Sequence, residues 1–272
     1  MQETCVTVTL MRILSKYYLV SGEQWCLDYI EKAAVNALYG AMNTKNQKAY
    51  SWESKSFHDP LPFDSYAPLT YSRHGIFTAG CRPLNDGTVY GCCACIGSAG
   101  VALYPLNAHI NRNEDLLINY LFPCKIKDED SDIEVVGNYL VDKKIVLKIK
   151  SLGKLKTVNV RIPKFIDGYN VNESLVEKDG YLIINKCGEF IFNFNFDIKY
   201  KVFNNKAIFK YGALVLGQDE ELNPKGLINI DLNNLSIKKI QPVDNELVRF
   251  NINGNIFANY SELGKHWDNK TI

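Results

Sequence analysis

The chain has 272 residues, with 31 lysines and arginines against 30 aspartates and glutamates, so its formal net charge is only +1. So small a charge gives no long-range field to attract nucleic-acid phosphates or an anionic membrane surface, and both partners are disfavoured. No apolar run approaches the roughly 20 residues of a membrane-spanning helix, and the start MQETCVTVTL lacks the order of a signal peptide. We therefore expect a soluble, cytoplasmic protein.

The first 42 residues predict two helices, because apolar side chains recur at helical spacing on either side of Ser21 and Gly22. In the first helix these side chains are Val6, Leu10, Ile13, Leu14 and Tyr17. Two helices form a hairpin with an apolar face that only further helices can cover. We therefore expect an exposed apolar face on residues 1–42, covered either by a missing N-terminal half of the protein or by a second copy of the chain.

Residues 43–91 are irregular in sequence, with several prolines and interleaved aromatic side chains. A segment of this length inside a compact domain predicts short strands or a functional site. A third helix is predicted from Cys93 to about Ile110.

Beyond residue 112 the pattern changes to short alternating runs such as KTVNVRIP, EFIFNFNF and ELVRFNIN, separated by glycine, asparagine and aspartate. This spacing is typical of an antiparallel β-sandwich. The sequence therefore predicts an α+β, multidomain protein with a helical region at 1–112 and β-sandwich structure at 113–272.

Three of the eight cysteines lie close together in YGCCACIGSAG, at positions 92, 93 and 95. A chain of this size does not need disulfides for stability, so we expect reduced thiols. Clustered thiols in a reducing compartment indicate a metal site or catalysis, whereas isolated cysteines are usually small core residues. We expect the core role for Cys26, Cys124 and Cys187.

A tetrahedral zinc site takes four thiolate, imidazole or carboxylate ligands. The cysteine pair supplies two of them, and Glu3 with Cys5 supplies a carboxylate and a thiolate at short spacing. The alternative is that the cysteines are simply buried and bind no metal, and that Glu3 begins a helix. Glu23, Glu31 and Glu53 are expected to be solvated or capping residues. His58, His74 and His109 are expected to be surface histidines or satisfied histidines of the core.

Three stretches, ETCVTVTLMRILSKYYLVSGEQWCLDYI, YGCCACIGSAGVALYP and VNVRIPKFIDGYNVN, together resemble the β-L-arabinofuranosidases of glycoside hydrolase family 127. The resemblance covers nearly the whole chain. It implies part of an (α/α)6-barrel at 1–112 before the β-sandwich, a retaining glycosidase, and an arabinofuranoside-type carbohydrate as substrate. By position it also implies Cys92 as a zinc-bound nucleophile, with Glu3, Cys5 and Cys93 as the other Zn²⁺ ligands.

In that family the general acid/base glutamate lies upstream of Glu-Thr-Cys, so the resemblance implies that this chain is catalytically incomplete alone. Tyr66, Arg73 and His74, in the aromatic segment, are candidates to contact a sugar. The alternative function is a non-catalytic zinc-binding scaffold or a carbohydrate-binding β-sandwich protein. In that case the aromatic side chains of Trp52, Tyr66 and Tyr71 stack on sugar rings.

Overall fold

The computed structural model describes residues 4–40, 49–51, 56–58, 81–83, 89–204, 206–218, 222–223, 230–243 and 246–263. Helices come first along the chain and antiparallel sheets afterwards, so the predicted α+β class is confirmed. Among these residues no helix is both long and apolar enough to cross a membrane.

The helical elements lie mainly in the N-terminal part of the chain. They are α1 (Thr4–Ser21), α2 (Trp25–Lys32), the π-helical η1 (Ala33–Leu38), α4 (Cys92–Leu106), α5 (Tyr139–Asp142) and the 3-10 helix η2 (Tyr260–Glu262). The predicted break after α1 is confirmed, and Gly22 has the left-handed φ of +73° that glycine tolerates best. The third helix ends at Leu106 rather than near Ile110, because Ile110 pairs with Leu117 in a strand ladder.

Short strands occur in the irregular segment before α4, as the sequence predicts. They form two hairpins, β1 (Ala49–Ser51) with β2 (Ser56–His58) and β3 (Cys81–Pro83) with β4 (Val89–Gly91).

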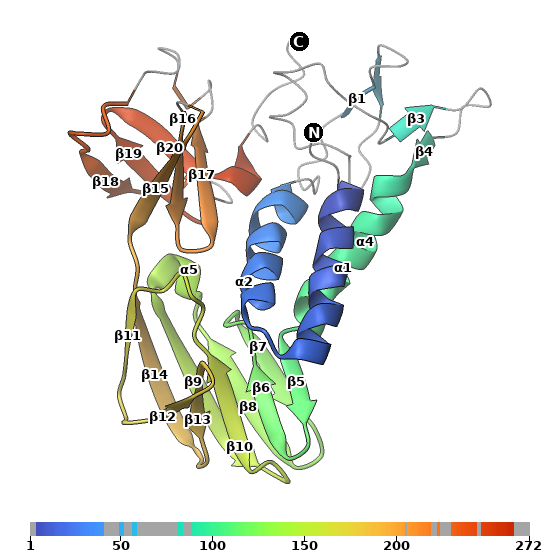
Figure 1. Ribbon diagram of the computed structural model, residues 1–272, viewed down its shortest axis with the longest axis vertical. Coiled ribbons are helices and arrows are strands. Elements are labelled where there is room, and N and C mark those ends of the chain that lie inside the picture. The colour runs from blue at the N-terminus through green and yellow to red at the C-terminus, as the bar shows by residue number, and fades with distance from the viewer. Residues whose placement is uncertain are drawn as a thin grey trace.

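Two five-stranded sheets form the sandwich below the helices (Figure 1). The first has the order β12 (Val176–Lys178), β13 (Tyr181–Ile184), β10 (Thr157–Arg161), β6 (Asp115–Ile118) and β5 (His109–Arg112). The second has the order β11 (Gly168–Val171), β14 (Gly188–Asn195), β9 (Lys144–Leu152), β8 (Ser131–Val136) and β7 (Cys124–Lys127). Strands β5 and β6, on either side of the predicted boundary at 112/113, pair with each other.

A six-stranded sheet follows along the chain. Its order is β15 (Ile198–Phe203), β16 (Lys206–Tyr211), β17 (Leu214–Gln218), β20 (Asn255–Asn259), β19 (Arg249–Ile252) and β18 (Ile237–Ile240). In Figure 1 it lies beside the upper part of the helical layer, and α5 lies where it meets the sandwich.

One strand pair differs from the predicted antiparallel arrangement. Strands β6 and β10 pair in parallel, with Leu116 opposite Val158. The chain leaves β6, builds β7, β8 and β9 in the facing sheet and returns to the first sheet in its original direction. This crossover makes the first sheet mixed rather than purely antiparallel.

Two hydrophobic cores hold these layers together. The larger one is shared by all three big sheets and includes Ile118, Leu147, Phe192 and Phe209. The smaller one lies among α1, α2, α4 and the start of the sandwich. Strands β8 and β14 contribute alternate side chains to the larger core, as their burial patterns show.

Candidate functional site

Three of the four predicted zinc ligands fall at the N-terminal ends of two helices that pack against each other. Cys5 is the second residue of α1 and is half-buried, while Cys92 and Cys93 are the first two residues of α4. Figure 1 shows both helices beginning at the same end of the helical layer, where β4 leads into α4. The fold therefore brings these three positions to one end of one layer, although 86 residues separate Cys5 from the two that open α4.

Gly100 sets how closely α1 and α4 approach. A Cβ atom added there meets Val8 Cγ2 at 2.4 Å and Leu38 Cδ1 at 3.1 Å. Real Cβ atoms do not tolerate the first of these distances, so only glycine allows this spacing between the helices. The close contact lies between the middle of α4 and the first half of α1.

The donor chemistry at this end of the layer fits zinc. Three thiols and one carboxylate are ligands that zinc accepts, and the positive end of a helix macrodipole favours thiolates over thiols. Glu3, Tyr66, Arg73 and His74 lie outside the described residues, as do the side chains of Cys92 and Cys93. Among the residues that the structure describes, no three His, Cys, Asp or Glu side chains form a metal-binding group. The zinc site therefore stays a prediction.

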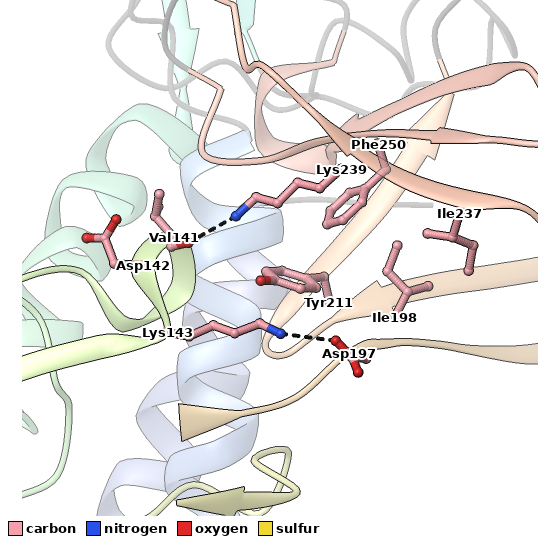
Figure 2. A pocket seen from close by; sticks show the side chains of 9 residues that line it. All are labelled: Val141, Asp142, Lys143, Asp197, Ile198, Tyr211, Ile237, Lys239 and Phe250. Atoms are coloured by element: carbon pink, nitrogen blue, oxygen red, sulfur yellow. Dashed lines mark hydrogen bonds and ion pairs between the residues drawn. The ribbon is translucent and has the colours of Figure 1, made fainter. Parts of the chain in front are cut away.

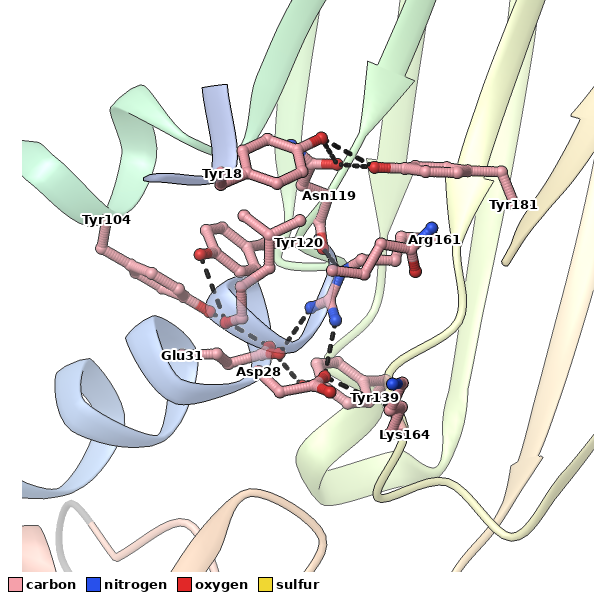
Figure 3. Close-up of polar contacts among 12 residues, drawn as sticks. Tyr18, Asp28, Glu31, Tyr104, Asn119, Tyr120, Tyr139, Arg161, Lys164 and Tyr181 are labelled. Carbon is pink, nitrogen blue, oxygen red and sulfur yellow. Dashed lines mark hydrogen bonds and ion pairs between the residues drawn. The ribbon is translucent and has the colours of Figure 1, made fainter. Parts of the chain in front are cut away.

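A second polar cluster, which the sequence did not predict, joins α2 to the first sheet (Figure 3). Arg161 on β10 donates from Nη1 to Asp28 Oδ1 at 2.6 Å and from Nη2 to Glu31 Oε2 at 3.0 Å. Its Nε donates to the carbonyl oxygen of Asn119 at 2.8 Å. The side chains of Arg161, Asp28 and Glu31 are 1%, 6% and 0% exposed, so this is a buried ion-pair cluster.

Tyrosine hydroxyls complete the hydrogen bonding of Glu31. Its Oε1 accepts hydrogen bonds from the hydroxyls of Tyr139 and Tyr104, the second at 3.3 Å. Burial raises the pKa of the Glu31 carboxyl, and the neighbouring Arg161 opposes this rise. Burial also raises the pKa of the Tyr104, Tyr120 and Tyr139 phenols well above its ordinary value, so they remain protonated donors.

The expectation that Glu31 is solvated or capping is therefore wrong. Asp28 and Glu31 are three residues apart, which places both carboxylates on one face of α2. In β10 the core valines alternate with Asn159 and Arg161, and this alternation turns Arg161 towards the helices. The three-residue spacing of the two carboxylates and the alternation along β10 are the sequence features from which this cluster could have been predicted. Every charged group in this cluster is hydrogen-bonded within the protein, so the cluster offers no open position to a substrate. It connects α2 to the first sheet. We call Arg161, Asp28 and Glu31, with the tyrosines around them, the joint.

A pocket of ≈ 490 Å³ lies between α5 and the six-stranded sheet (Figure 2). Lys239 crosses it from β18 and donates to the carbonyl oxygen of Val141 at 3.1 Å, while Lys143 pairs with Asp197 at 3.0 Å. Both ammonium groups lie over the ring of Tyr211, at 5.6 and 5.5 Å from its centroid. The lysines thus connect the sandwich to the six-stranded sheet, and they are already engaged by protein groups.

The isolated cysteines differ in environment. Cys26 is fully buried, as predicted, whereas Cys187 is exposed, which corrects the expected core role. Cys187 lies in the turn between β13 and β14, where strand alternation no longer directs side chains inwards. Cys124 is half-buried with Sγ 3.3 Å from His109 Nε2, and burial raises the pKa of its thiol to about 11. His109 is therefore a satisfied histidine, as expected.

No family profile and no curated protein sequence matches the chain. Solved structures match its fold over 98% of its length. One is a glycoside hydrolase family 127 β-L-arabinofuranosidase from Geobacillus stearothermophilus T6, with a TM-score of 0.66 and 14% sequence identity over 98% of this chain. The second is a family 127 β-arabinofuranosidase, with a TM-score of 0.60 and 16% identity over 98% of this chain. The third is a glycoside hydrolase, with a TM-score of 0.62 and 12% identity over 98% of this chain.

This chain spans 48%, 48% and 50% of those three structures, which is about half their length. At these identities the likeness is one of fold. The resemblance drawn from the sequence motifs is thus confirmed at the level of the fold.

Proposed function

We propose that this chain is the nucleophile-bearing part of a retaining glycoside hydrolase of the β-L-arabinofuranosidase type. The observation that supports the proposal is the joint occurrence of a fold shared with family 127 enzymes and the convergence of Cys5, Cys92 and Cys93 on one end of the helical layer. In this proposal Cys92 is the nucleophile.

Zinc is the proposed cofactor, held by Glu3, Cys5, Cys92 and Cys93. When bound, a zinc ion keeps ligating thiols ionised near neutral pH. The two helix N-termini act in the same direction, because their macrodipoles favour negative charge on these cysteines. The chain itself therefore contributes both the donor set and a field that stabilises a thiolate at Cys92.

The reaction at Cys92 proceeds in two displacements. First, Sγ of Cys92 attacks the anomeric carbon, and the bond from this carbon to the leaving oxygen breaks as that oxygen takes up a proton. Second, water attacks the same carbon, the carbon–sulfur bond breaks, and the water gives its proton to a base. Two inversions at one carbon leave the anomeric configuration unchanged.

In this proposal, the residue that donates the proton in the first step is not part of this chain. Glu31 is the most deeply buried carboxyl of α2, but its oxygens are occupied by Arg161, Tyr104 and Tyr139. The resemblance places the acid upstream of Glu3. We therefore propose that α1, α2 and α4 are part of an (α/α)6-barrel whose other helices bring the acid, and that turnover by this chain alone is negligible.

A substrate that needs no acid tests the nucleophile separately. The dinitrophenolate of 2,4-dinitrophenyl β-L-arabinofuranoside leaves without protonation, so it still reacts with an activated thiolate. We expect one pentosyl adduct on the peptide that contains Cys92, measured by mass spectrometry of the zinc-loaded chain. The Cys92→Ser variant is expected to show no adduct there. Cys187→Ser, which removes an exposed thiol outside the site, is the matched control and is expected to keep it.

The adduct and the metal content are measured on the same protein. We expect near one zinc per chain, falling on Cys93→Ser but not on Cys187→Ser. Zinc without an adduct at Cys92 supports the non-catalytic scaffold instead. Zinc below about 0.2 per chain in protein purified without chelator rejects the metal site.

A further inference from the structure

The hairpin of β15 and β16 forms one edge of the six-stranded sheet, where β15 is the outermost strand (Figure 1). Residues that lie opposite each other in such a ladder, or two apart along one strand, point to the same side of the sheet. One side of this hairpin therefore carries four lysines and two apolar residues, and all six are exposed. We name it the lysine face: Lys199, Lys201, Phe203, Lys206, Ile208 and Lys210.

The positive charge of the lysine face is largely unbalanced. Neither strand contains an aspartate or a glutamate. Lys199 pairs with Asp167, but no ion pair between described residues involves Lys201, Lys206 or Lys210. Lysine on an edge strand discourages pairing with a second chain, yet Lys206 and Lys210 lie on β16, which is inside the sheet. Like charges directly opposite each other, as Lys199 and Lys210 are, destabilise a sheet, so folding does not explain this arrangement, whereas an anionic ligand does.

The lysine face has the dimensions of a short stretch of extended polymer. At the rise of a β-strand, Lys206 and Lys210 on β16 are separated by about 13 Å. Between the lysines, the side chain of Phe203 is 62% exposed and that of Ile208 is 39% exposed. A ligand that matches this face therefore carries repeated negative charges along an extended chain, with apolar surface between them.

The residue types of the lysine face select among anionic polymers. Lysine is a point charge with three rotatable donors and suits single carboxylates, whereas arginine is the residue preferred for phosphate. The two strands contain no arginine. The formal net charge of +1 also gives no long-range attraction for nucleic acid. Sugar rings have apolar C–H faces that pack on aromatic side chains such as Phe203. The face therefore fits a polysaccharide with carboxylates on its sugars.

We infer that the lysine face binds a polyuronide, an acidic polysaccharide with a carboxylate on each sugar, and anchors it to the protein. The choice of a polysaccharide over an acidic polypeptide rests on the proposed function, because a glycosidase that acts on branches of a polymer gains effective concentration from a second contact with the polymer's backbone. The lysine face itself does not depend on zinc or on Cys92. Binding there and the adduct at Cys92 are therefore tested separately, and failure of either leaves the other standing.

Binding of a fluorescein-labelled oligogalacturonate to the full chain tests the inference. Fluorescence anisotropy is expected to show binding that weakens as the salt concentration rises, because the contacts join exposed charges. The methyl-esterified oligosaccharide keeps the sugar rings but loses the negative charges, and it is expected to bind at least about tenfold more weakly. Phe203→Ser is expected to weaken the binding of oligogalacturonate at least about threefold and to leave the binding of polyglutamate unchanged.

Removal of lysines provides the matched comparison. The double variant Lys201→Gln with Lys210→Gln is expected to weaken the binding of oligogalacturonate at least about tenfold. Lys150→Gln with Lys178→Gln removes the same charge from exposed positions on the two five-stranded sheets and is expected to weaken it less than about twofold. All four lysines are exposed, so thermal unfolding followed by circular dichroism is expected to show that both variants remain folded.

Four results overturn the inference. Two of them are the absence of binding and equal weakening by the two double variants. Polyglutamate that binds as tightly as oligogalacturonate shows that the lysine face takes an acidic polypeptide. Tighter binding to phosphatidylserine vesicles shows that it takes an anionic membrane surface.

Discussion

The two faces of the helical layer differ in how completely they are satisfied. Towards the sheets, Arg161, Asp28 and Glu31 are buried, and each is hydrogen-bonded within the protein. Away from the sheets, the outer face of α1 leaves large apolar side chains in solvent, and we name these residues the outer seam: Val6, Leu10, Ile13, Tyr17 and Val20. A finished interface pairs its polar groups and covers its apolar ones. The comparison teaches that the helical layer is buried and hydrogen-bonded on the side of the sandwich, whereas the outer side of α1 exposes apolar side chains.

The two faces of the helical layer also differ in how much they contribute to the stability of the fold. Interactions at the joint are long-range in sequence, because they connect α2 to a strand some 130 residues later. They hold the helices on the sheets. The side chains of the outer seam are exposed in the folded chain, so changes there are expected to have little effect on folding.

The largest effect is expected at the joint itself. Arg161→Met removes the cation and leaves two carboxylates buried without it, which costs about 3–5 kcal/mol of unfolding free energy. Urea denaturation followed by circular dichroism measures this loss. Lys156→Met is the matched control, since the Lys156–Glu114 ion pair is exposed and screened by solvent, so its loss is expected to change the unfolding free energy much less. Similar losses in the two variants contradict a stabilising joint.

Alkaline pH tests the tyrosines of the joint. The pKa values of Tyr104, Tyr120 and Tyr139 are raised in the folded protein by burial, so their contribution is complete below the ordinary value of 10.0 and is lost as the pH rises above it. Each such group lowers the unfolding free energy by about 1.4 kcal/mol per pH unit, or about 4 kcal/mol per unit for three. Tyrosinate absorbance from these residues is expected to appear only together with unfolding. A pH titration followed by absorbance and circular dichroism distinguishes this from ionisation in the folded state.

An intermediate effect is expected where α1 meets α4. Gly100→Val forces a side chain against Val8 and costs about 1–3 kcal/mol by overpacking. Ala99→Val adds the same side chain at the neighbouring exposed position and is expected to cost less than about 0.7 kcal/mol, the helix propensity of valine alone. Thermal unfolding of the two variants gives the difference. Equal melting temperatures show that the helices can separate without cost.

The smallest effect on stability is expected on the outer seam. Ile13→Gln changes an exposed side chain, and surface substitutions usually alter the unfolding free energy by less than about 0.5 kcal/mol. Non-specific aggregation of the chain is expected to fall, which light scattering at increasing concentration measures. Met11→Gln on the buried face of the same helix is the contrast and is expected to cost several times more. A large loss from Ile13→Gln means that the seam is covered in the folded chain.

The sequence by itself determined the element types and their order, the break at Gly22, the exposed apolar face of the first helix and the motifs that resemble family 127. These features follow from local periodicity and short spacing, which one stretch of chain contains. Only the tertiary structure decided that Glu31 is buried against Arg161 and that β6 and β10 run in parallel. It also decided that α1 and α4 begin at one end of the layer. Each of these depends on residues far apart in the chain, whose meeting is set by how the layers pack and not by any local pattern.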